Sequence, residues 1–114
     1  MRRATVLEVK EFPEVLNASQ ARVFLEEVQS YSYDDRAYFV LDCSNIGPMG
    51  GLSIQLMLCC LEEAMKRNGD VKLASVPAEA RSRLKLIGVD RLFEIFDTNA
   101  DAVNSFRRLS LDTA

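Results

Sequence analysis

A chain of 114 residues, 48% of them hydrophobic, is long enough for one domain with a buried core, and a second domain is not expected. The net charge of −3 argues against a nucleic-acid partner, because contact with phosphates requires a basic face. The sequence contains no histidine, which removes the commonest general base and the commonest metal ligand.

The cysteines and the amino-terminal segment indicate a compartment. The 3 cysteines include no CxxC pair and cannot all form disulfides within the chain, which suits a reducing environment and buried, inert thiols. The first residues, MRRATVLEVKEF, lack the apolar run of a signal peptide, and no segment approaches the length of a membrane span. We therefore expect a cytoplasmic protein without direct membrane insertion, a single domain over residues 1–114 with a core from about residue 4 to 109.

The first predicted elements are a strand and a helix. Residues 5–10 alternate between apolar and polar, which predicts a strand near a sheet edge that Pro13 ends. Asn17, followed by Gln20, has the pattern of a capping box before a helix over residues 18–31. We expect one face of this helix to pack on the sheet through Ala21, Phe24, Leu25 and Val28.

A strand, a glycine-rich turn and a long helix form the centre of the chain. Residues 38–43, YFVLDC, predict a strand that is buried on both faces. The turn contains Gly47, Pro48, Gly50 and Gly51, and the helix after it continues to about Arg67. We expect its inward stripe at Ile54, Leu58, Leu61 and Met65. Two ion pairs are expected on its solvent side, Glu62 with Lys66 and Glu63 with Arg67.

The remaining elements continue the alternation of strands and helices. Residues 70–76 predict a third strand, residues 77–87 a helix that Gly88 ends, and residues 92–96 a short strand before a last helix capped by Thr98. This order predicts an α/β fold with a mostly parallel sheet of four to five strands and about four helices.

Basic residues are concentrated between positions 66 and 91. This stretch contains 7 basic and 3 acidic residues. We interpret them as a solvated face, with steering of an acidic partner as the alternative. They are Lys66, Arg67, Lys72, Arg81, Arg83, Lys85 and Arg91.

The polar residues near the turn give little support to an enzyme. Asp42, at the end of the buried strand, is interpreted as an acceptor for the backbone or the Ser44 hydroxyl group in the following turn. The glycine turn could favour an anion at the start of a helix, but it matches neither GxGxxG nor GxxxxGK[ST]. The possible nucleophiles Ser44, Ser53, Cys59 and Cys60 have no histidine to activate them. We expect no catalytic residue, no metal and no cofactor.

Three segments, in order along the chain, resemble the STAS domains, the family of anti-sigma factor antagonists and sulfate-transporter tails. They are LDCS at residues 41–44, GDVKLASV followed by Pro77, and IGVDRLFEIFDT at residues 87–98. The resemblance covers nearly the whole chain and implies a STAS-like domain that binds a protein, foremost a kinase-like anti-sigma factor, and thereby releases a sigma factor.

Family members that are controlled by phosphorylation carry a D-S-[S/T/A]-G turn before the long helix. Counted without gaps from Leu41, these positions fall on Gly50, Gly51, Leu52 and Ser53, so the motif is absent. The resemblance then implies a docking turn that binds its partner constitutively, without control by phosphorylation. The expected partner-binding residues are Pro48, Met49, Gly50, Gly51, Leu52, Ser53 and Leu56, with Ser53 and Ser44 as candidate substitute phosphoacceptors.

Three alternatives remain open from the sequence. STAS domains also serve as scaffolds or accessory subunits of signalling and transporter complexes, where no phosphorylation is needed. A nucleotide or anion sensor that uses the glycine turn is a further alternative. Exposed apolar positions on the long helix also allow a homodimer.

Overall fold

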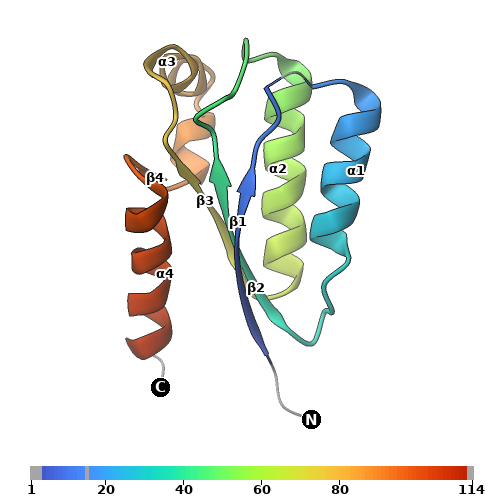
Figure 1. The fold of residues 1–114 in the computed structure, drawn as a ribbon, viewed down its shortest axis with the longest axis vertical. Helices are drawn as coiled ribbons and strands as arrows, with labels where there is room; N and C mark the ends of the chain where they lie inside the picture. The colour runs from blue at the N-terminus through green and yellow to red at the C-terminus, as the bar shows by residue number, and fades with distance from the viewer. Residues whose placement is uncertain (1–3, 15, 113–114) are drawn as a thin grey trace.

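Four strands form one sheet with helices on both faces in the computed structural model, which describes residues 4–14 and 16–112 (Figure 1). The strands are β1 (Thr5–Glu11), β2 (Arg36–Asp42), β3 (Asp70–Ala74) and β4 (Ile95–Phe96). The helices are α1 (Ala18–Gln29), α2 (Gly51–Lys66), α3 (Ala78–Ile87) and α4 (Asn99–Asp112), with a short 3-10 helix η1 (Val89–Leu92) after α3. The predicted α/β fold with a parallel sheet is confirmed.

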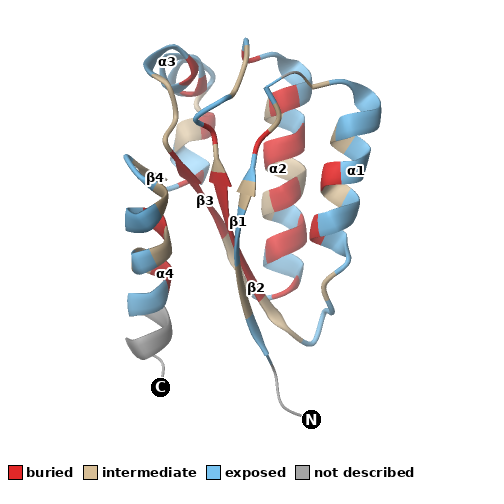
Figure 2. Cartoon of the chain, in the orientation of Figure 1, coloured by how far each residue is buried: buried red, intermediate tan, exposed pale blue. Residues whose placement is uncertain are grey.

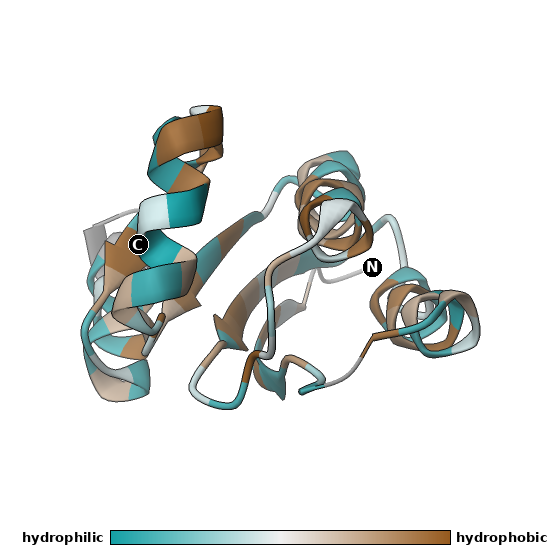
Figure 3. Ribbon diagram, turned by 90° about the horizontal axis from the view of Figure 1, so that it is seen from above, coloured by the Kyte–Doolittle hydropathy of each residue, from teal (hydrophilic) through white to brown (hydrophobic). Residues whose placement is uncertain are grey.

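The sheet is parallel throughout and follows the chain, in the order β1-β2-β3-β4, so β1 lies at an edge as predicted. Crossovers between parallel strands are nearly always right-handed, so the helices that connect successive strands fall on one face. Accordingly α1, α2 and α3 contribute to one core cluster, and α4 packs on the opposite face (Figure 3).

The two central strands carry the core, which appears as the red segments of Figure 2. Phe39 and Leu41 of β2 belong to the cluster beneath α1 and α2, whereas Tyr38 and Val40 belong to the cluster beneath α4. Because successive side chains of a strand point to opposite faces, β2 is buried on both sides, as its uninterrupted apolar sequence predicted.

The predicted helix boundaries rest on hydrogen bonds that the structure contains. Asn17 Oδ1 accepts from Gln20 N at 2.9 Å and Gln20 Oε1 accepts from Asn17 N at 3.2 Å, which completes the capping box of α1. Thr98 Oγ1 accepts from Asp101 N at 3.1 Å at the start of α4. Gly88 has φ +87°, the left-handed conformation that ends α3.

The segment after β3 differs from its prediction. The strand ends at Ala74 because Ser75 adopts φ +58°, which turns the chain out of the ladder two residues earlier than expected. Pro77 then occupies the N-cap of α3 and not its first helical position. The start of the predicted strand 92–96 belongs to η1, so β4 retains only Ile95–Phe96.

The inward stripe predicted for α2 is wrong. The side chains that α2 buries are Ser53, Leu56, Met57, Cys60, Glu63 and Ala64. Met65 is 62% exposed, and Ile54, Leu58 and Leu61 are only half-buried. The helix is apolar around most of its circumference, so the spacing alone was compatible with two different inward stripes. The observed stripe contains the small residues Ser53, Cys60 and Ala64, which allow the helix to approach the sheet closely.

Three charged residues expected on solvated surfaces are buried. Glu63 and Arg67 are paired as predicted, but their side chains are 9% and 1% exposed and do not lie on the solvent side of α2. Lys72 is also buried. Its Nζ donates to Ser105 Oγ at 2.7 Å and lies 4.2 Å from the centroid of the Phe106 ring, and these contacts offset the loss of hydration. The remaining predicted ion pair, Glu62 with Lys66, lies at the surface at 3.6 Å.

Across the described residues, no helix combines the length and the apolar content that crossing a bilayer requires.

Candidate functional site

The glycine-rich turn lies at the carboxyl ends of the strands, between β2 and the start of α2 (Figure 1). Three backbone hydrogen bonds hold it: Cys43 N donates to Ala74 O at 2.9 Å, Ile46 N to Cys43 O at 3.1 Å, and Gly47 N to Glu14 O at 3.0 Å. A Cβ atom at Gly47 would lie 2.3 Å from the Glu14 oxygen, so this position requires glycine. The turn is therefore fixed to both neighbouring loops.

The structure divides the seven predicted partner-binding residues into two groups. Pro48, Gly50, Gly51 and Leu52 are exposed at the surface, whereas Met49, Ser53 and Leu56 are buried. Leu52 is 37% exposed, so it offers apolar area at the first turn of α2. The three buried side chains lie below the surface of the turn and support its shape.

Gly50 and Gly51 have no steric reason to be glycine. A Cβ atom at either position would meet nothing within 4 Å, and Gly50 has an extended backbone with φ −110°. Gly50 is the N-cap of α2 and provides no side-chain hydrogen bond there. Space for a larger side chain is thus present at both positions.

A groove of about 420 Å³ joins the turn to the first turns of α3. Its walls come from two segments far apart in the sequence: Ile46, Gly47, Pro48 and Met49 from the turn, and Pro77, Glu79, Ala80 and Arg83 from the N-cap and body of α3. The contribution of α3 to this groove was not predicted from the sequence. Loops that follow neighbouring parallel strands meet at the same sheet edge, so the position of Pro77 just after the third strand was the available signal.

Asp42 accepts hydrogen bonds from two sides and serves the structure of the same edge. Its Oδ1 accepts from Ser44 N at 3.0 Å, as interpreted from the sequence, and its Oδ2 accepts from Asn99 Nδ2 at 3.0 Å. Burial raises the pKa of the carboxyl group, but the hydrogen bonds from Asn99 and Ser44 outweigh it and hold the pKa below its ordinary value. Asp42 is thus an ionised acceptor that ties the turn to α4.

The two candidate phosphoacceptors differ in access. Ser44 is exposed, whereas Ser53 is only 7% exposed at the start of α2.

The cysteines are free and mostly enclosed. Cys43 and Cys60 are buried and Cys59 is half-buried. Burial raises the pKa of the Cys43 and Cys60 thiols to about 12, so these groups are unreactive near neutral pH. In the described part of the chain, no cluster of three or more histidine, cysteine or acidic side chains could hold a metal ion.

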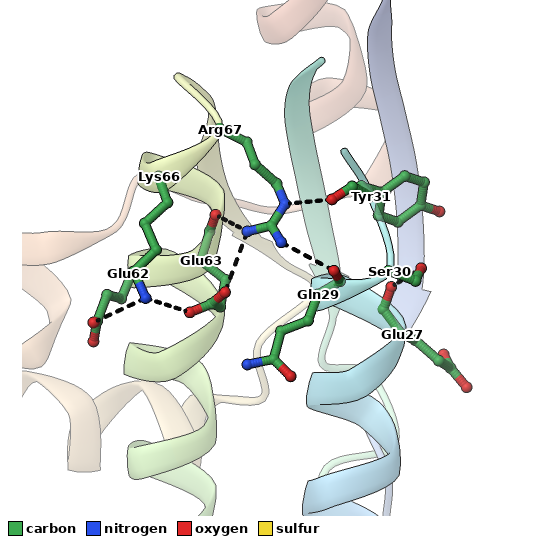
Figure 4. Close-up of polar contacts among 8 residues, drawn as sticks. All are labelled: Glu27, Gln29, Ser30, Tyr31, Glu62, Glu63, Lys66 and Arg67. Atoms are coloured by element: carbon green, nitrogen blue, oxygen red, sulfur yellow. Dashed lines mark hydrogen bonds and ion pairs between the residues drawn. The ribbon is translucent and has the colours of Figure 1, made fainter. Parts of the chain in front are cut away.

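At the opposite end of α2, Arg67 joins two helix ends in a buried polar cluster (Figure 4). Its Nε donates to Tyr31 O at 2.9 Å and its Nη2 to Gln29 O at 3.0 Å, both at the end of α1. Its Nη1 donates to Glu63 O at 2.7 Å and to Glu63 Oε1 at 3.2 Å. We refer to Arg67, Glu63 and the carbonyls of Gln29 and Tyr31 as the Arg67 clamp.

The Arg67 clamp is engaged within the protein, because four of the five N–H donors of the guanidinium already have acceptors. The guanidinium carbon of Arg67 lies 4.4 Å from the centroid of the Tyr33 ring, a cation–π contact. A hydrogen bond from Lys66, followed by one from Arg67, holds the pKa of Glu63 below its ordinary value. The hydrogen bonds of this buried, charged cluster hold the end of α1 against α2. The candidate site is therefore the turn and the groove beside it.

Comparisons with known proteins agree with the fold. A family model described as STAS domain matches residues 8–102. An anti-sigma-factor antagonist (STAS) domain protein from Planctomyces limnophilus has a similar solved structure, with 19% identity, TM-score 0.72, and coverage of 85% of this chain and 87% of that one. No curated protein sequence matches the chain significantly.

Two transporter-related structures are similar as well. A sulfate transporter family protein from Wolinella succinogenes has 15% identity and TM-score 0.76, over 93% of this chain and 88% of that one. The STAS domain of a SulP transporter from Vibrio cholerae has 15% identity and TM-score 0.72, over 100% of this chain and 88% of that one. At these identities the likeness shows the fold alone.

Proposed function

This chain belongs to the STAS domain family, and we propose that it is a non-catalytic module of the anti-sigma factor antagonist kind that binds a kinase-like anti-sigma factor. Occupying that partner would release a sigma factor, which makes the chain a cytoplasmic regulator of transcription. We further propose that binding is constitutive and that phosphorylation of the turn does not control it.

The observation that carries the proposal is the exposed apolar corner at the start of α2. Leu52 is 37% exposed and directly follows Gly50 and Gly51, which are exposed as well, as is Pro48 earlier in the turn. Neither Gly51 nor Leu52 can accept a phosphate, and Ser53 is buried. A phosphate adds nearly two negative charges that an interface must desolvate, whereas leucine adds area that favours association.

A substitution at each end of α2 tests the site. The immobilised chain first captures its partner from a lysate of its source, mass spectrometry identifies that protein, and calorimetry measures the affinity of the purified pair. Leu52→Asp should weaken binding by at least about tenfold, because the new carboxylate loses hydration in the interface. Met65→Asp is the matched control, since it places the same side chain at an exposed apolar position near the other end of the helix.

The outcomes separate the parts of the proposal. An unchanged affinity for Leu52→Asp, with an unchanged melting temperature, would remove the turn from the interface. Incubation with the kinase-like partner and ATP should leave the chain unmodified, and stoichiometric phosphate by mass spectrometry would contradict constitutive binding. Gly51→Ser adds a hydroxyl group where a Cβ meets nothing within 4 Å. This variant tests whether the missing hydroxyl group is the reason that the chain is not phosphorylated.

A second candidate function is an accessory or scaffold subunit of a transporter or signalling complex. The similar structures of a sulfate transporter family protein from Wolinella succinogenes and of a SulP transporter STAS domain from Vibrio cholerae favour it. The same capture experiment discriminates the two functions. Retention of a membrane transporter or a large scaffold, and no kinase-like protein, would support this second function.

A further inference from the structure

We infer that the docking surface extends from the turn across the groove to α3, and that it selects an acidic segment of the partner. An apolar side chain of that segment occupies the groove, and a neighbouring carboxylate pairs with Arg83. The inference rests on the proposed function, because it names the partner chemistry of that same site.

The groove has an apolar floor, and its lining contains one cation, Arg83, and one anion, Glu79. Met49 and Ala80 are 8% and 6% exposed, and Ile46, Pro48 and Pro77 complete the apolar lining. Arg83 lines the groove with an exposed side chain. A volume of about 420 Å³ accommodates a large apolar side chain together with part of its backbone.

The groove is formed before any partner binds. The Gly47–Glu14 and Cys43–Ala74 backbone hydrogen bonds fix the turn on one side. Pro48 and Pro77 restrict the backbone on both walls, since the proline ring locks φ. A segment that enters the groove therefore meets a surface that loses little conformational freedom on binding.

The charge of α3 and η1 is opposite to the charge of the whole chain. Residues 78–92 contain four basic side chains, Arg81, Arg83, Lys85 and Arg91, and two acidic ones, Glu79 and Asp90, which gives +2. The complete chain carries −3, so the remainder carries −5. An acidic partner is thus attracted to this face and repelled by the rest of the molecule, which orients the encounter.

Arg83 is the basic residue of α3 that is available at the groove. Arg81 lies 3.8 Å from Asp97 and lines a separate cavity beside β4. Glu79, the acidic residue in the lining, lies in the first turn of α3, where the helix dipole stabilises a negative charge. Among the residues that the structure describes, Arg83 forms no ion pair, which leaves its guanidinium for a carboxylate of the partner.

A peptide library tests the inference even before the partner is identified. The probe is a phage-displayed library of random peptides of about 12 residues, selected on the immobilised full chain. We expect the selected sequences to be enriched in aspartate and glutamate next to leucine, isoleucine, methionine or phenylalanine. Fluorescence polarisation then measures the affinity of the best synthetic peptide for each variant.

Arg83→Glu and Lys85→Glu form a matched pair, because both reverse one exposed charge on α3 but only Arg83 lines the groove. We expect Arg83→Glu to weaken peptide binding by at least about tenfold and Lys85→Glu by less than about threefold. Equal effects of the two, or no acidic enrichment over the unselected library, would overturn the inference.

Failure of this inference is distinguishable from failure of the proposed function. With the captured partner, a loss of affinity for Leu52→Asp but not for Arg83→Glu would retain the docking turn and exclude the groove. A loss for neither variant would remove both. Unchanged melting temperatures are expected for the two variants, because both side chains are exposed.

Discussion

The two ends of α2 use their residues in opposite ways. At the start, Gly50, Gly51 and Leu52 are exposed, and the N-cap has no side-chain hydrogen bond. At the end, Glu63 and Arg67 are charged but buried, and Arg67 donates four hydrogen bonds to α1 and α2. Charge near the end is therefore buried within the fold, whereas apolar area near the start is exposed, which is the area that we propose a partner covers.

The difference separates stability from binding along one helix. Substitutions in the Arg67 clamp should change the free energy of unfolding and leave the docking surface intact, because the clamp lies at the other end of α2. Substitutions at the exposed corner should change the affinity for a partner and shift the free energy of unfolding by about 1 kcal/mol or less. Three substitutions and one change of pH test how much each part of this region contributes to stability.

Arg67→Met should produce the largest loss, about 3–5 kcal/mol of unfolding free energy, because it leaves Glu63 buried and the carbonyls of Gln29 and Tyr31 unpaired. Urea denaturation measures it. Lys66→Met is the control, since Lys66 also pairs with Glu63 but its side chain is 47% exposed, and its loss should stay below about 1 kcal/mol. Equal losses would show that burial of Arg67 is not the source of the effect.

Alkaline pH should act on the middle of α2 and on the end of β2. The pKa values of Cys60 and Cys43 rise from 9.0 to about 12 on folding, so the folded state disfavours their ionised form. The contribution of the thiols to stability is fully present below pH 9 and is lost as the pH rises toward 12, by about 1.4 kcal/mol per thiol at pH 10. Urea denaturation from pH 7 to 10 measures the slope. Cys60→Ala should reduce it, and an identical slope would contradict the assignment.

Gly47→Ala should cost about 1–2 kcal/mol, because its Cβ would lie 2.3 Å from the Glu14 carbonyl oxygen and force the turn away from β1. Thermal unfolding measures the stability, and peptide or partner affinity should fall in parallel as the groove deforms. A stability equal to that of the unsubstituted chain would show that the contact with Glu14 is readily released.

Gly51→Ala should produce the smallest effect, a gain of about 0.5–1 kcal/mol. The position is helical and open, so alanine removes freedom of the unfolded chain without a clash. The same thermal assay that shows a loss for Gly47→Ala should show this gain. A loss here would mean that the start of α2 needs glycine for a reason other than space.

The sequence predicted most of the fold because its signals are local. Asn17 with Gln20 marks the start of α1, Gly88 marks the end of α3, and the unbroken apolar run of β2 identifies a central strand. Alternation of strands and helices then determines a parallel sheet. Ser75 was missed because a left-handed serine has no distinct pattern in one sequence.

The candidate site was only partly predictable, because it depends on which face of α2 meets the sheet. The sequence of α2 is compatible with two apolar stripes. Because buried charges are rare unless they are paired, Glu63 and Arg67 indicated that their side of the helix faces solvent, which is wrong. The pairing of Arg67 with backbone carbonyls of α1 is not visible in a sequence. The groove was not predicted either, because its walls come from two segments that are distant in the sequence, one with Met49 and one with Arg83.

The empty space around Gly50 and Gly51 has an evolutionary consequence. No neighbouring atom lies within 4 Å of the position that a Cβ atom would occupy at either glycine. A descendant of this protein could therefore acquire an acidic residue and a hydroxyl group at these positions by point mutation, without any change to the interior. Gly47, with the Glu14 carbonyl against it, offers no such path. Gly50 and Gly51 are thus the positions of the turn where the fold tolerates a change of side chain.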